Sequence, residues 1–421
     1  MAFPVSLDRP ALRAAQWEKL RAILQRMQVH GGSAAERVAG VESLESFCRV
    51  VNPLSKADIL ADRQLHPPFG SYLLEPLEHY TRLCQTSGTS TGQPIAWIDT
   101  PKSWEAMLKC WRRVYEAAEL QPGKDRLFFA FSFGPFLGFW TAFEAATTEF
   151  LSIPGGGLSS SARLRAMARY QATVLCCTPT YAMRLGEQIG EASGVQRQEL
   201  AVHSVIVAGE AGGSLPAVRG RIEALWGARV FDHHGMTEVG PVSFESRAHP
   251  LKLLVMEEAY LAEVVDPHTG CEVAEGECGE LLLTTLDRAA CPLLRYRTGD
   301  WVRKTFLEGR LCLDGGVLSR VDDMVVVRGV NVYPSAIEEV VRRYPEVVEF
   351  QVRQTAVAEM EELRVRAEIQ PDLKEVETEA LLRRLEGELR DTFALRIPVD
   401  KADPGSLPRH EFKAKRWVRA E

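Results

Sequence analysis

Apolar residues recur at helical spacing along three parts of the first 120 positions. Residues 10–28 carry them every three or four positions, and residues 43–51 repeat the pattern over a shorter length. A longer segment, residues 101–120, places Trp104 and Trp111 on one face. This periodicity predicts amphipathic helices that cap the start of the chain, followed by a longer helix ahead of the first strand.

Short apolar runs then alternate with helical segments. The runs are LFFAF, TVLCC, HSVIVAG and ARVFDHHG, at residues 127–131, 173–177, 203–209 and 228–235. Such alternation favours a layered α/β architecture with a largely parallel sheet. From residue 253 to residue 314 the pattern changes to β runs separated by Gly, Pro and Asp, which predicts a smaller β-rich subdomain.

The end of the chain follows a β-α-β-β-α order that starts after Asp322. We therefore predict an α/β protein with a large N-terminal body of several subdomains at residues 1–321. A small α+β C-terminal domain is expected at residues 322–421.

Composition narrows the class of protein. The 421 residues carry a net charge of −7, with 46% hydrophobic and 25% charged residues, which is typical of a folded globular chain. This acidic balance offers no basic field for nucleic acid, and no stretch of 18 apolar residues predicts a membrane span. The nine cysteines are scattered, so the chain is expected in a reducing cytoplasm. Cys271 and Cys278 are spaced too widely for a typical zinc motif.

One segment is dense in hydroxyl groups and glycines. The run TSGTSTGQP occupies residues 86–94, ahead of a β-like segment. Because glycine permits close backbone approach, the N–H and O–H donors of such a run are able to wrap a phosphate chain. The run lacks the Gly-Lys-Ser/Thr ending of a Walker A loop. It predicts a triphosphate-binding loop, with a flexible surface loop as the alternative.

A second segment, FDHHGMTE at residues 231–238, ends a strand with a hydroxyl directly before a carboxylate. We interpret Thr237 as a donor to a phosphate and Glu238 as a ligand of the Mg²⁺ that neutralises it. A capped turn is the alternative. His233 and His234 are adjacent on a strand and point to opposite faces, so they are not expected to share a metal ion.

Three further segments carry polar candidates. RYRTGD, at residues 295–300, ends on a carboxylate whose two oxygens suit the vicinal hydroxyls of a ribose, with a solvated turn as the alternative. RVDDM, at residues 320–324, lies at the predicted domain boundary. LPRHEFKAKR, at residues 407–416, lies in a locally basic tail, which a frayed terminus also explains.

These five segments, in this order, resemble the adenylate-forming enzymes of the acyl-CoA synthetase superfamily, and within it the phenylacetate–CoA ligase family. The most specific matches are RGVNVYPSAIEEV and LPRHEFKAKR. The resemblance implies a mobile C-terminal domain and two half-reactions. A carboxylate attacks the α-phosphate of ATP and releases pyrophosphate, and a thiol, usually that of coenzyme A, then displaces AMP.

The resemblance also implies roles for individual residues. The catalytic residues are Lys413, which bridges the carboxylate and the phosphate, Thr237 at the α-phosphate, and Glu238 at Mg²⁺. Asp322 is the hinge of the C-terminal domain. The residues implied to bind the β- and γ-phosphates are Thr86, Ser87, Gly88, Thr89, Thr91 and Gly92. Asp300 and Arg320 are implied to bind the ribose. The residues implied to line the adenine and the acyl group are Gly209, Glu210, Asp232, His233, His234 and Gly235.

The chain departs from the family pattern in several places. Ser90 is an extra residue in the phosphate loop, and His234 stands where the superfamily usually has an aromatic residue. Lys415 lies close enough to Lys413 to rival it. The run FGPFLGFW is bulkier than the glycine-rich equivalent of the family. Aromatic rings predicted to line an apolar acid pocket, or else to belong to the core, are those of Phe133, Phe136, Phe139, Trp140 and Tyr181.

The sequence therefore predicts a ligase that uses ATP and Mg²⁺ to activate an aromatic or otherwise apolar carboxylic acid, with coenzyme A as the expected acceptor. A carrier protein or an amine as acceptor, and a non-catalytic acyl-adenylate-binding regulator, remain open alternatives. Retention of Glu238, Asp300 and Lys413 argues against the regulator, because a binder has no use for a mobile lysine. A kinase or another NTPase is disfavoured because neither a Walker lysine nor a kinase motif set is present. The oligomeric state is left open, with a dimer among the states considered.

Overall fold

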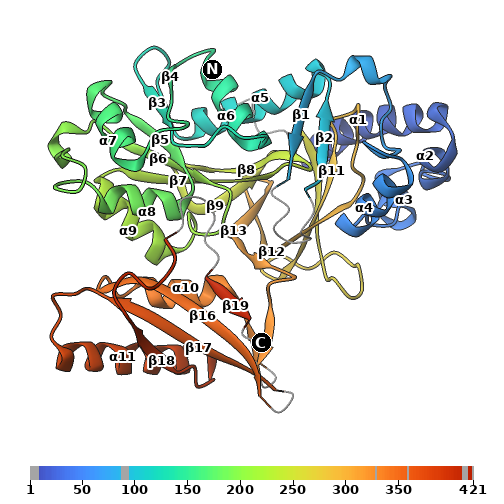
Figure 1. The fold of residues 1–421 in the computed structure, drawn as a ribbon. Coiled ribbons are helices and arrows are strands. Elements are labelled where there is room, and N and C mark those ends of the chain that lie inside the picture. The colour runs from blue at the N-terminus through green and yellow to red at the C-terminus, as the bar shows by residue number, and fades with distance from the viewer. Residues whose placement is uncertain (1–8, 87–93, 328–329, 358–359, 410–415, 420–421) are drawn as a thin grey trace.

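The computed structural model of the chain describes residues 9–86, 94–327, 330–357, 360–409 and 416–419, and Figure 1 shows their arrangement. The N-terminal part of the chain forms a large body built on an extended sheet. A smaller unit, coloured orange to red, lies against one side of this body. Within the described ranges, no helix combines the length and apolarity that a membrane span requires.

In the described ranges, eleven strands of the body form one sheet, in the order β10-β11-β12-β13-β9-β8-β7-β6-β5-β3-β4. The parallel strands are β3 (Arg126–Phe129), β4 (Leu151–Pro154), β5 (Val174–Cys177), β6 (Ser204–Ala208) and β7 (Arg229–Met236). The antiparallel strands are β8 (Gly240–Ser246), β9 (His249–Val255), β10 (Tyr260–Val265), β11 (Cys278–Thr285), β12 (Tyr296–Leu307) and β13 (Arg310–Arg320).

The prediction of a largely parallel sheet is right for the four runs on which it was based and wrong for the sheet as a whole. A short turn after β7 returns the chain antiparallel to itself, since a tight connection cannot join parallel strands. The segment predicted as a β-rich subdomain, residues 253–314, extends this same hydrogen-bonded sheet.

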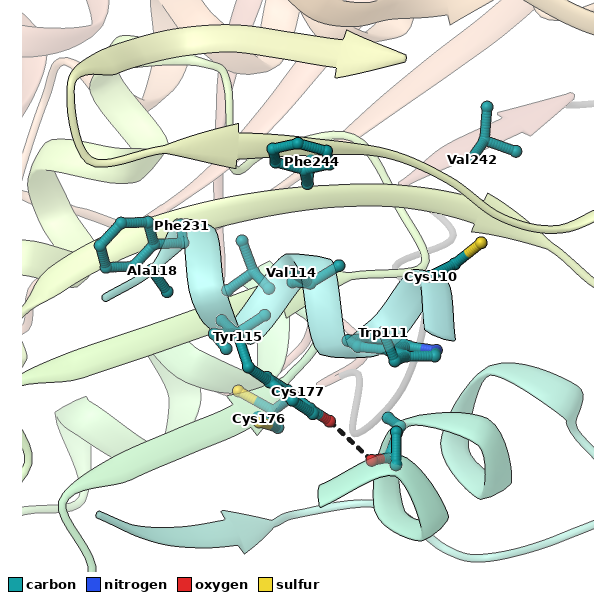
Figure 2. Close-up of a cluster of buried hydrophobic side chains, with 14 of the residues drawn as sticks. Cys110, Trp111, Val114, Tyr115, Ala118, Cys176, Cys177, Phe231, Val242 and Phe244 are labelled. Carbon is teal, nitrogen blue, oxygen red and sulfur yellow. Dashed lines mark hydrogen bonds between the residues drawn. The ribbon is translucent and has the colours of Figure 1, made fainter. Parts of the chain in front are cut away.

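Helices cover the faces of the sheet. The first helix after the hairpin, α5 (Pro101–Ala117), is capped by Thr100, whose hydroxyl oxygen accepts a hydrogen bond from the Ser103 N–H at 3.3 Å. Its predicted apolar face, with Trp104 and Trp111, is buried. Figure 2 shows α5 lying along the sheet, with its side chains among residues of β5, β7 and β8. The helices of this part are α5 (Pro101–Ala117), α6 (Leu137–Ala146), α7 (Ser160–Arg169), α8 (Pro179–Glu187) and α9 (Pro216–Trp226), with the 3-10 helix η2 (Arg197–Glu199).

The predicted N-terminal helices pack on the antiparallel end of the sheet. Gln16 Nε2 donates to the carbonyl oxygens of Glu257 and Tyr260, each at 2.9 Å. Ser43 and Ser55 each close a capping box at the start of the following helix. The elements here are α1 (Arg9–His30), α2 (Gly32–Arg37), α3 (Leu44–Val50), α4 (Lys56–Leu65), the 3-10 helix η1 (Leu77–His79), and the hairpin of β1 (Arg82–Gln85) and β2 (Ala96–Asp99).

The C-terminal part has its own sheet, in the order β18-β17-β16-β19, and its own apolar core around Val340, Phe350 and Leu385. The predicted β-α-β-β-α order is confirmed. The predicted final loop also contains β18 and β19, which pair in parallel with β17 and β16. The elements are β14 (Val325–Val327), β15 (Val330–Val332), α10 (Pro334–Arg342), β16 (Val347–Val357), β17 (Met360–Ile369), α11 (Glu375–Phe393), β18 (Val399–Ala402) and β19 (Trp417–Arg419).

Polar contacts join α10 and the strand that follows it to the body. The Glu339 carboxylate accepts a hydrogen bond from the Ala217 N–H at the start of α9, at 3.0 Å for Oε2 and 3.3 Å for Oε1. Arg221 Nη1 donates to the carbonyl of Val347 at 3.1 Å. These contacts fix one side of the C-terminal unit against α9, as Figure 1 shows.

Candidate active site

The predicted nucleotide residues gather at the carboxyl ends of β6 and β7. Gly209 and Glu210 directly follow β6, and Thr237 and Glu238 directly follow β7. In open α/β sheets, ligands bind in the crevice outside the carboxyl ends of the parallel strands. Asp300, on the antiparallel strand β12, contacts His234 of β7 and so lies at the same end of the sheet.

The Asp300 carboxylate lies between two nitrogen donors. His234 Nε2 is 3.0 Å from Oδ2, and Arg320 Nη1 is 3.0 Å from Oδ1. Burial raises the pKa of Asp300, but the contacts with His234 and Arg320 outweigh it and hold that pKa below its usual value. Arg320 also donates to the carbonyl of Thr298 at 2.6 Å. Gly299 has φ 73°, and a Cβ there would lie 2.5 Å from Arg320 Nη2, so glycine is required for this approach.

Glu238 is nearly buried in the turn between β7 and β8. Lys56 Nζ, at the start of α4, lies 3.5 Å from Glu238 Oε1. Burial and the neighbouring Glu238 carboxylate raise the pKa of Tyr296, which also lies within electrostatic reach of Asp300. Tyr296 therefore lies near both the Glu238 and the Asp300 carboxylates.

The Glu238 carboxylate fits a magnesium ion that arrives bound to a nucleotide. The described part of the chain has no group of three or more His, Cys, Asp or Glu side chains able to hold a metal ion. Mg²⁺ in nucleotide enzymes uses one or two carboxylates and completes its shell with substrate phosphates and water. The buried Glu238 carboxylate, in the turn that the sequence predicts to bind phosphate, fits that requirement.

Two carboxylates, Glu210 just after β6 and Asp232 within β7, contact neighbouring segments. Glu210 Oε1 accepts from the Thr180 N–H at 2.8 Å, in the first turn of α8. Asp232 Oδ2 accepts from Ser214 Oγ at 2.6 Å, and burial raises the pKa of Asp232. A Cβ at Gly213 would lie 2.5 Å from the Asp232 carboxylate. Asp232 therefore lies directly beneath the loop that follows β6.

The two histidines of β7 face opposite sides of the strand, as predicted. His233 Nδ1 donates to the Ser243 carbonyl at 2.7 Å, and its ring lies 4.3 Å from that of Trp111 on α5. Burial lowers the pKa of His233 to about 3, so the ring is neutral. The structure thus brings His234 to Asp300 and places His233 on the α5 side of the sheet.

Four of the five predicted pocket aromatics form one cluster. The ring of Phe139 is 5.8 Å from that of Phe136 and stacks at 4.1 Å on that of Phe131. The ring of Phe133 is 5.2 Å from that of Trp140 and joins the cluster through Phe131 at 6.5 Å. This cluster borders the hairpin of β1 and β2, which carries the predicted phosphate loop, because the Gln85 N–H donates to the Pro135 carbonyl at 2.5 Å.

Tyr181, the fifth aromatic, has different neighbours. It is buried on α8, where its hydroxyl lies 3.0 Å from Ser160 Oγ and the Arg163 guanidinium lies 4.9 Å from its ring centre. Tyr181 thus has polar neighbours while it belongs to the apolar core of the body.

The remaining predicted residues lie at the edges of the described ranges or outside them. Thr86 Oγ1 accepts from the Ile95 N–H at 2.8 Å, at the start of the predicted phosphate loop. Asp322 is exposed, with Oδ1 3.2 Å from Arg320 Nε. The predicted residues outside the described ranges are Ser87, Gly88, Thr89, Thr91, Gly92 and Lys413, together with the extra Ser90 and the rival Lys415.

Sequence reasoning missed Lys56. In the sequence it belongs to the amphipathic start of a helix, directly after the capping Ser55, and nothing around it indicates a ligand. Its position 3.5 Å from Glu238 arises from packing of the N-terminal helices on the sheet.

Two family models match the chain. The model for AMP-binding enzymes matches residues 63–286, and the model for the C-terminal domain of AMP-binding enzymes matches residues 329–419. Among curated proteins, the phenylacetate-coenzyme A ligase of Thermus thermophilus is 31% identical, with 96% of each chain covered. The phenylacetate-coenzyme A ligase of Escherichia coli is 29% identical over 83% of this chain and 80% of the other.

Solved structures show the same relationship. Crystal structures of a 2-hydroxyisobutyryl-CoA ligase cover 97% of this chain and 89% of their own, with a TM-score of 0.90 at 25% identity in the postadenylation state. The same ligase in the thioesterification state gives a TM-score of 0.70 at 26% identity. The described arrangement therefore matches the postadenylation state more closely than the later one.

Fold, site and family models together define an AMP-forming acid–thiol ligase of the adenylate-forming superfamily. Within that superfamily, the chain belongs to the phenylacetate–CoA ligase family.

Proposed function

We propose that this chain joins an apolar, aromatic-type carboxylic acid to coenzyme A in two steps at one site. First, a carboxylate oxygen bonds to the α-phosphorus of ATP as the bond to pyrophosphate breaks. The thiol sulfur then bonds to the acyl carbon, and AMP leaves with the electrons of the carbon–oxygen bond. The observation that best supports this is the Asp300 carboxylate held between His234 and Arg320, with Glu238 directly after β7, the strand that carries His234.

We assign the nucleotide roles from this arrangement. Asp300, ionised through its two donors, accepts the ribose hydroxyls together with Arg320. Thr237 donates to the α-phosphate, and Glu238 ligates Mg²⁺, which supplies neutralising charge when bound with ATP. Thr86 and residues 87–92 surround the outer phosphates. In-line displacement at phosphorus depends on such positioning more than on covalent help.

The two faces of β7 divide the adenine from the acyl group. His234 faces Asp300 and belongs with the nucleotide, together with Gly209, Glu210, Asp232 and Gly235. His233 faces Trp111 on the α5 side and belongs with the acyl group.

The aromatic cluster of Phe133, Phe136, Phe139 and Trp140 supports an apolar acyl group. Its rings offer no charge to a polar substituent, and offset or edge contacts favour another ring. Tyr181, with its hydroxyl near Ser160, is assigned to the polar end of the acid. The relatives are named for phenylacetate and 2-hydroxyisobutyrate, so both aromatic and short aliphatic acids belong in the test panel.

Rotation of residues 322–421 against residues 1–321 couples the two steps in this proposal. Asp322 is the hinge, which suits an exposed position between β13 and β14. Lys413 serves the first step as the cation between the carboxylate and the phosphate.

Coenzyme A is the proposed acceptor, because the relatives at 25% identity or more are CoA ligases. A cytoplasmic location is proposed because all nine cysteines are free thiols, which a reducing compartment maintains. Sedimentation velocity separates a monomer from the dimer that we also consider.

The decisive experiment is acid-dependent ATP–pyrophosphate exchange across a panel of aromatic and aliphatic acids. We expect exchange with aromatic acids, and thioester formation when coenzyme A is added. Absence of exchange with every acid, in folded protein that binds ATP, would refute the proposal. Exchange without formation of a CoA thioester would indicate that the acceptor is a carrier protein or an amine instead.

A further inference from the structure

Arg288 is a buried cation to which the motifs assign no role. It follows β11, and its side chain is 3% exposed. Nε donates to Asp99 Oδ1 at 2.6 Å, and Nη2 donates to Asp99 Oδ2 at 2.5 Å. Asp99 ends β2, and its side chain is 1% exposed, so the pair is a bidentate ion pair removed from water.

The third nitrogen of Arg288 reaches the predicted phosphate-binding turn. Nη1 donates to the carbonyl of Thr237 at 2.8 Å and to that of Glu238 at 2.7 Å. These are main-chain contacts, so they act on the backbone that carries the two side chains. One guanidinium therefore holds consecutive peptide groups of the turn.

The other end of the pair belongs to the hairpin that carries the phosphate loop. β1 and β2 are paired, and residues 86–95, which include the predicted phosphate loop, connect them. Two guanidinium groups also lie over the ring of Trp97 in β2. That of Arg288 is 5.5 Å from the ring centre, and that of Arg63 in α4 is 4.9 Å from it. Arg288 thus spans two segments that are expected to hold the same triphosphate.

A buried ion pair rarely adds much net stability, because desolvation of both charges offsets their attraction. Its geometry, by contrast, is strict, since an unsatisfied donor in this environment is costly. Such a pair is suited to fixing one segment against another.

We propose that Arg288, anchored by Asp99, is a positioning residue that fixes the Thr237–Glu238 turn against the phosphate-loop hairpin and so sets the affinity of Glu238 for the Mg²⁺ of Mg²⁺·ATP. This inference rests on the proposed function, because it takes Glu238 to be the magnesium ligand.

The chain supplies a matched control. Arg295 forms a bidentate pair with Glu263, at 3.0 and 2.9 Å, and its side chain is also buried, at 7% exposed. Its Nη1 donates to the carbonyl of Val51 in the N-terminal cap, at 2.8 Å. Both pairs join a buried arginine to a carboxylate. They differ in their main-chain contacts, because Arg288 also contacts the Thr237–Glu238 turn, whereas Arg295 also contacts Val51 of the N-terminal cap.

The experiment compares Arg288→Lys with Arg295→Lys. Lysine keeps the charge but has no planar fork to bridge a carboxylate and two carbonyls. Binding of ATP is measured without acid by calorimetry across a magnesium titration, and ATP–pyrophosphate exchange is measured over the same range. Melting temperatures report on the fold.

Loss of a partner that orients a metal ligand typically costs 10- to 100-fold in metal affinity, so we expect Arg288→Lys to raise the half-saturating Mg²⁺ concentration by roughly that factor. Arg295→Lys is expected to lower the melting temperature and leave the magnesium dependence unchanged. Equal magnesium dependence in the two variants would overturn the proposal.

If Arg288→Lys does not fold, Asp99→Asn, with Glu263→Gln as its control, applies the same test with a smaller change of shape. The calorimetric measurement of ATP binding also separates this inference from the proposed function. Magnesium-dependent ATP binding without exchange in the wild type would refute the ligase activity and still test Arg288. A wild type that binds ATP without magnesium dependence would overturn the inference itself.

Discussion

Glu339 of α10 supplies the acceptor that the first turn of α9 lacks. Pro216 occupies the first helical position and has no N–H, and Leu215 at the N-cap has no side-chain acceptor. The Ala217 N–H is therefore the first free donor of α9, and both Glu339 oxygens reach it, at 3.0 and 3.3 Å. A cap that is normally local comes here from the C-terminal unit.

The contribution of this contact follows from its chemistry. Replacing a capping acceptor by Ala costs about 1 kcal/mol, and a negative charge at a helix N-terminus adds about 0.3–1 kcal/mol. The Glu339 side chain is 17% exposed, which limits solvent screening. Its i,i+4 pair with Arg343, at 3.7 Å, adds little. Glu339→Ala is thus expected to weaken the described orientation by about 1–2 kcal/mol, or roughly 5- to 30-fold in population.

The assay separates the two half-reactions. Because the described orientation resembles a postadenylation state, we expect Glu339→Ala to slow acid-dependent ATP–pyrophosphate exchange by up to that factor. Thioester formation from a supplied acyl-adenylate is expected to stay the same or to accelerate. Glu339→Gln, which keeps the shape and loses the charge, should give a smaller loss.

Glu379 provides the control, since it is an exposed glutamate of α11 paired with Arg383 one turn away. Glu379→Ala is expected to leave both half-reactions unchanged. Equal slowing of both half-reactions by Glu339→Ala, or equal slowing by the two alanine variants, would refute the role of Glu339 in holding this orientation.

Three further predictions concern single residues. Lys413→Ala should abolish pyrophosphate exchange and leave ATP binding largely intact. The same loss in Lys415→Ala but not in Lys413→Ala would move the assignment to Lys415. Lys56→Ala removes the cation 3.5 Å from Glu238, so we expect a lower exchange rate with an unchanged KM for the acid; a change in that KM alone would contradict a role at the phosphates. Burial lowers the pKa of His233 to about 3 in the folded protein, whereas the pKa of an unfolded histidine is about 6.5. Between these two pH values the unfolded chain binds a proton that the folded chain does not, and this favours unfolding. The unfolding free energy of the wild type relative to His233→Asn should therefore fall as pH drops from about 6.5 towards 3, by about 1.4 kcal/mol per pH unit, and a pH-independent difference in urea titrations would disprove this.

Periodicity and capping residues determined much of the local structure. The apolar face of α5 follows from the spacing of its residues, and it is buried as the sequence predicts; the Thr100 cap is a local feature that the structure adds. The opposite orientations of His233 and His234 follow from the period of a strand alone. The phosphate-loop residues, Thr237, Glu238 and Asp300 were proposed from short contiguous motifs, which supply their own turns and donors. The other nucleotide residues came only from the family resemblance.

The sequence by itself thus determined which helices and principal strands form, and which motifs carry hydroxyl and carboxylate groups. Tertiary structure alone decided that β8 to β13 continue the parallel strands in one sheet, because ladder hydrogen bonds join backbone groups and leave no pattern in the side chains. It also decided that Lys56 meets Glu238 and that Arg288 meets Asp99, which lies 189 positions away. Contacts over such separations depend on how whole elements pack, and the residues around each partner carry no local signal of the other.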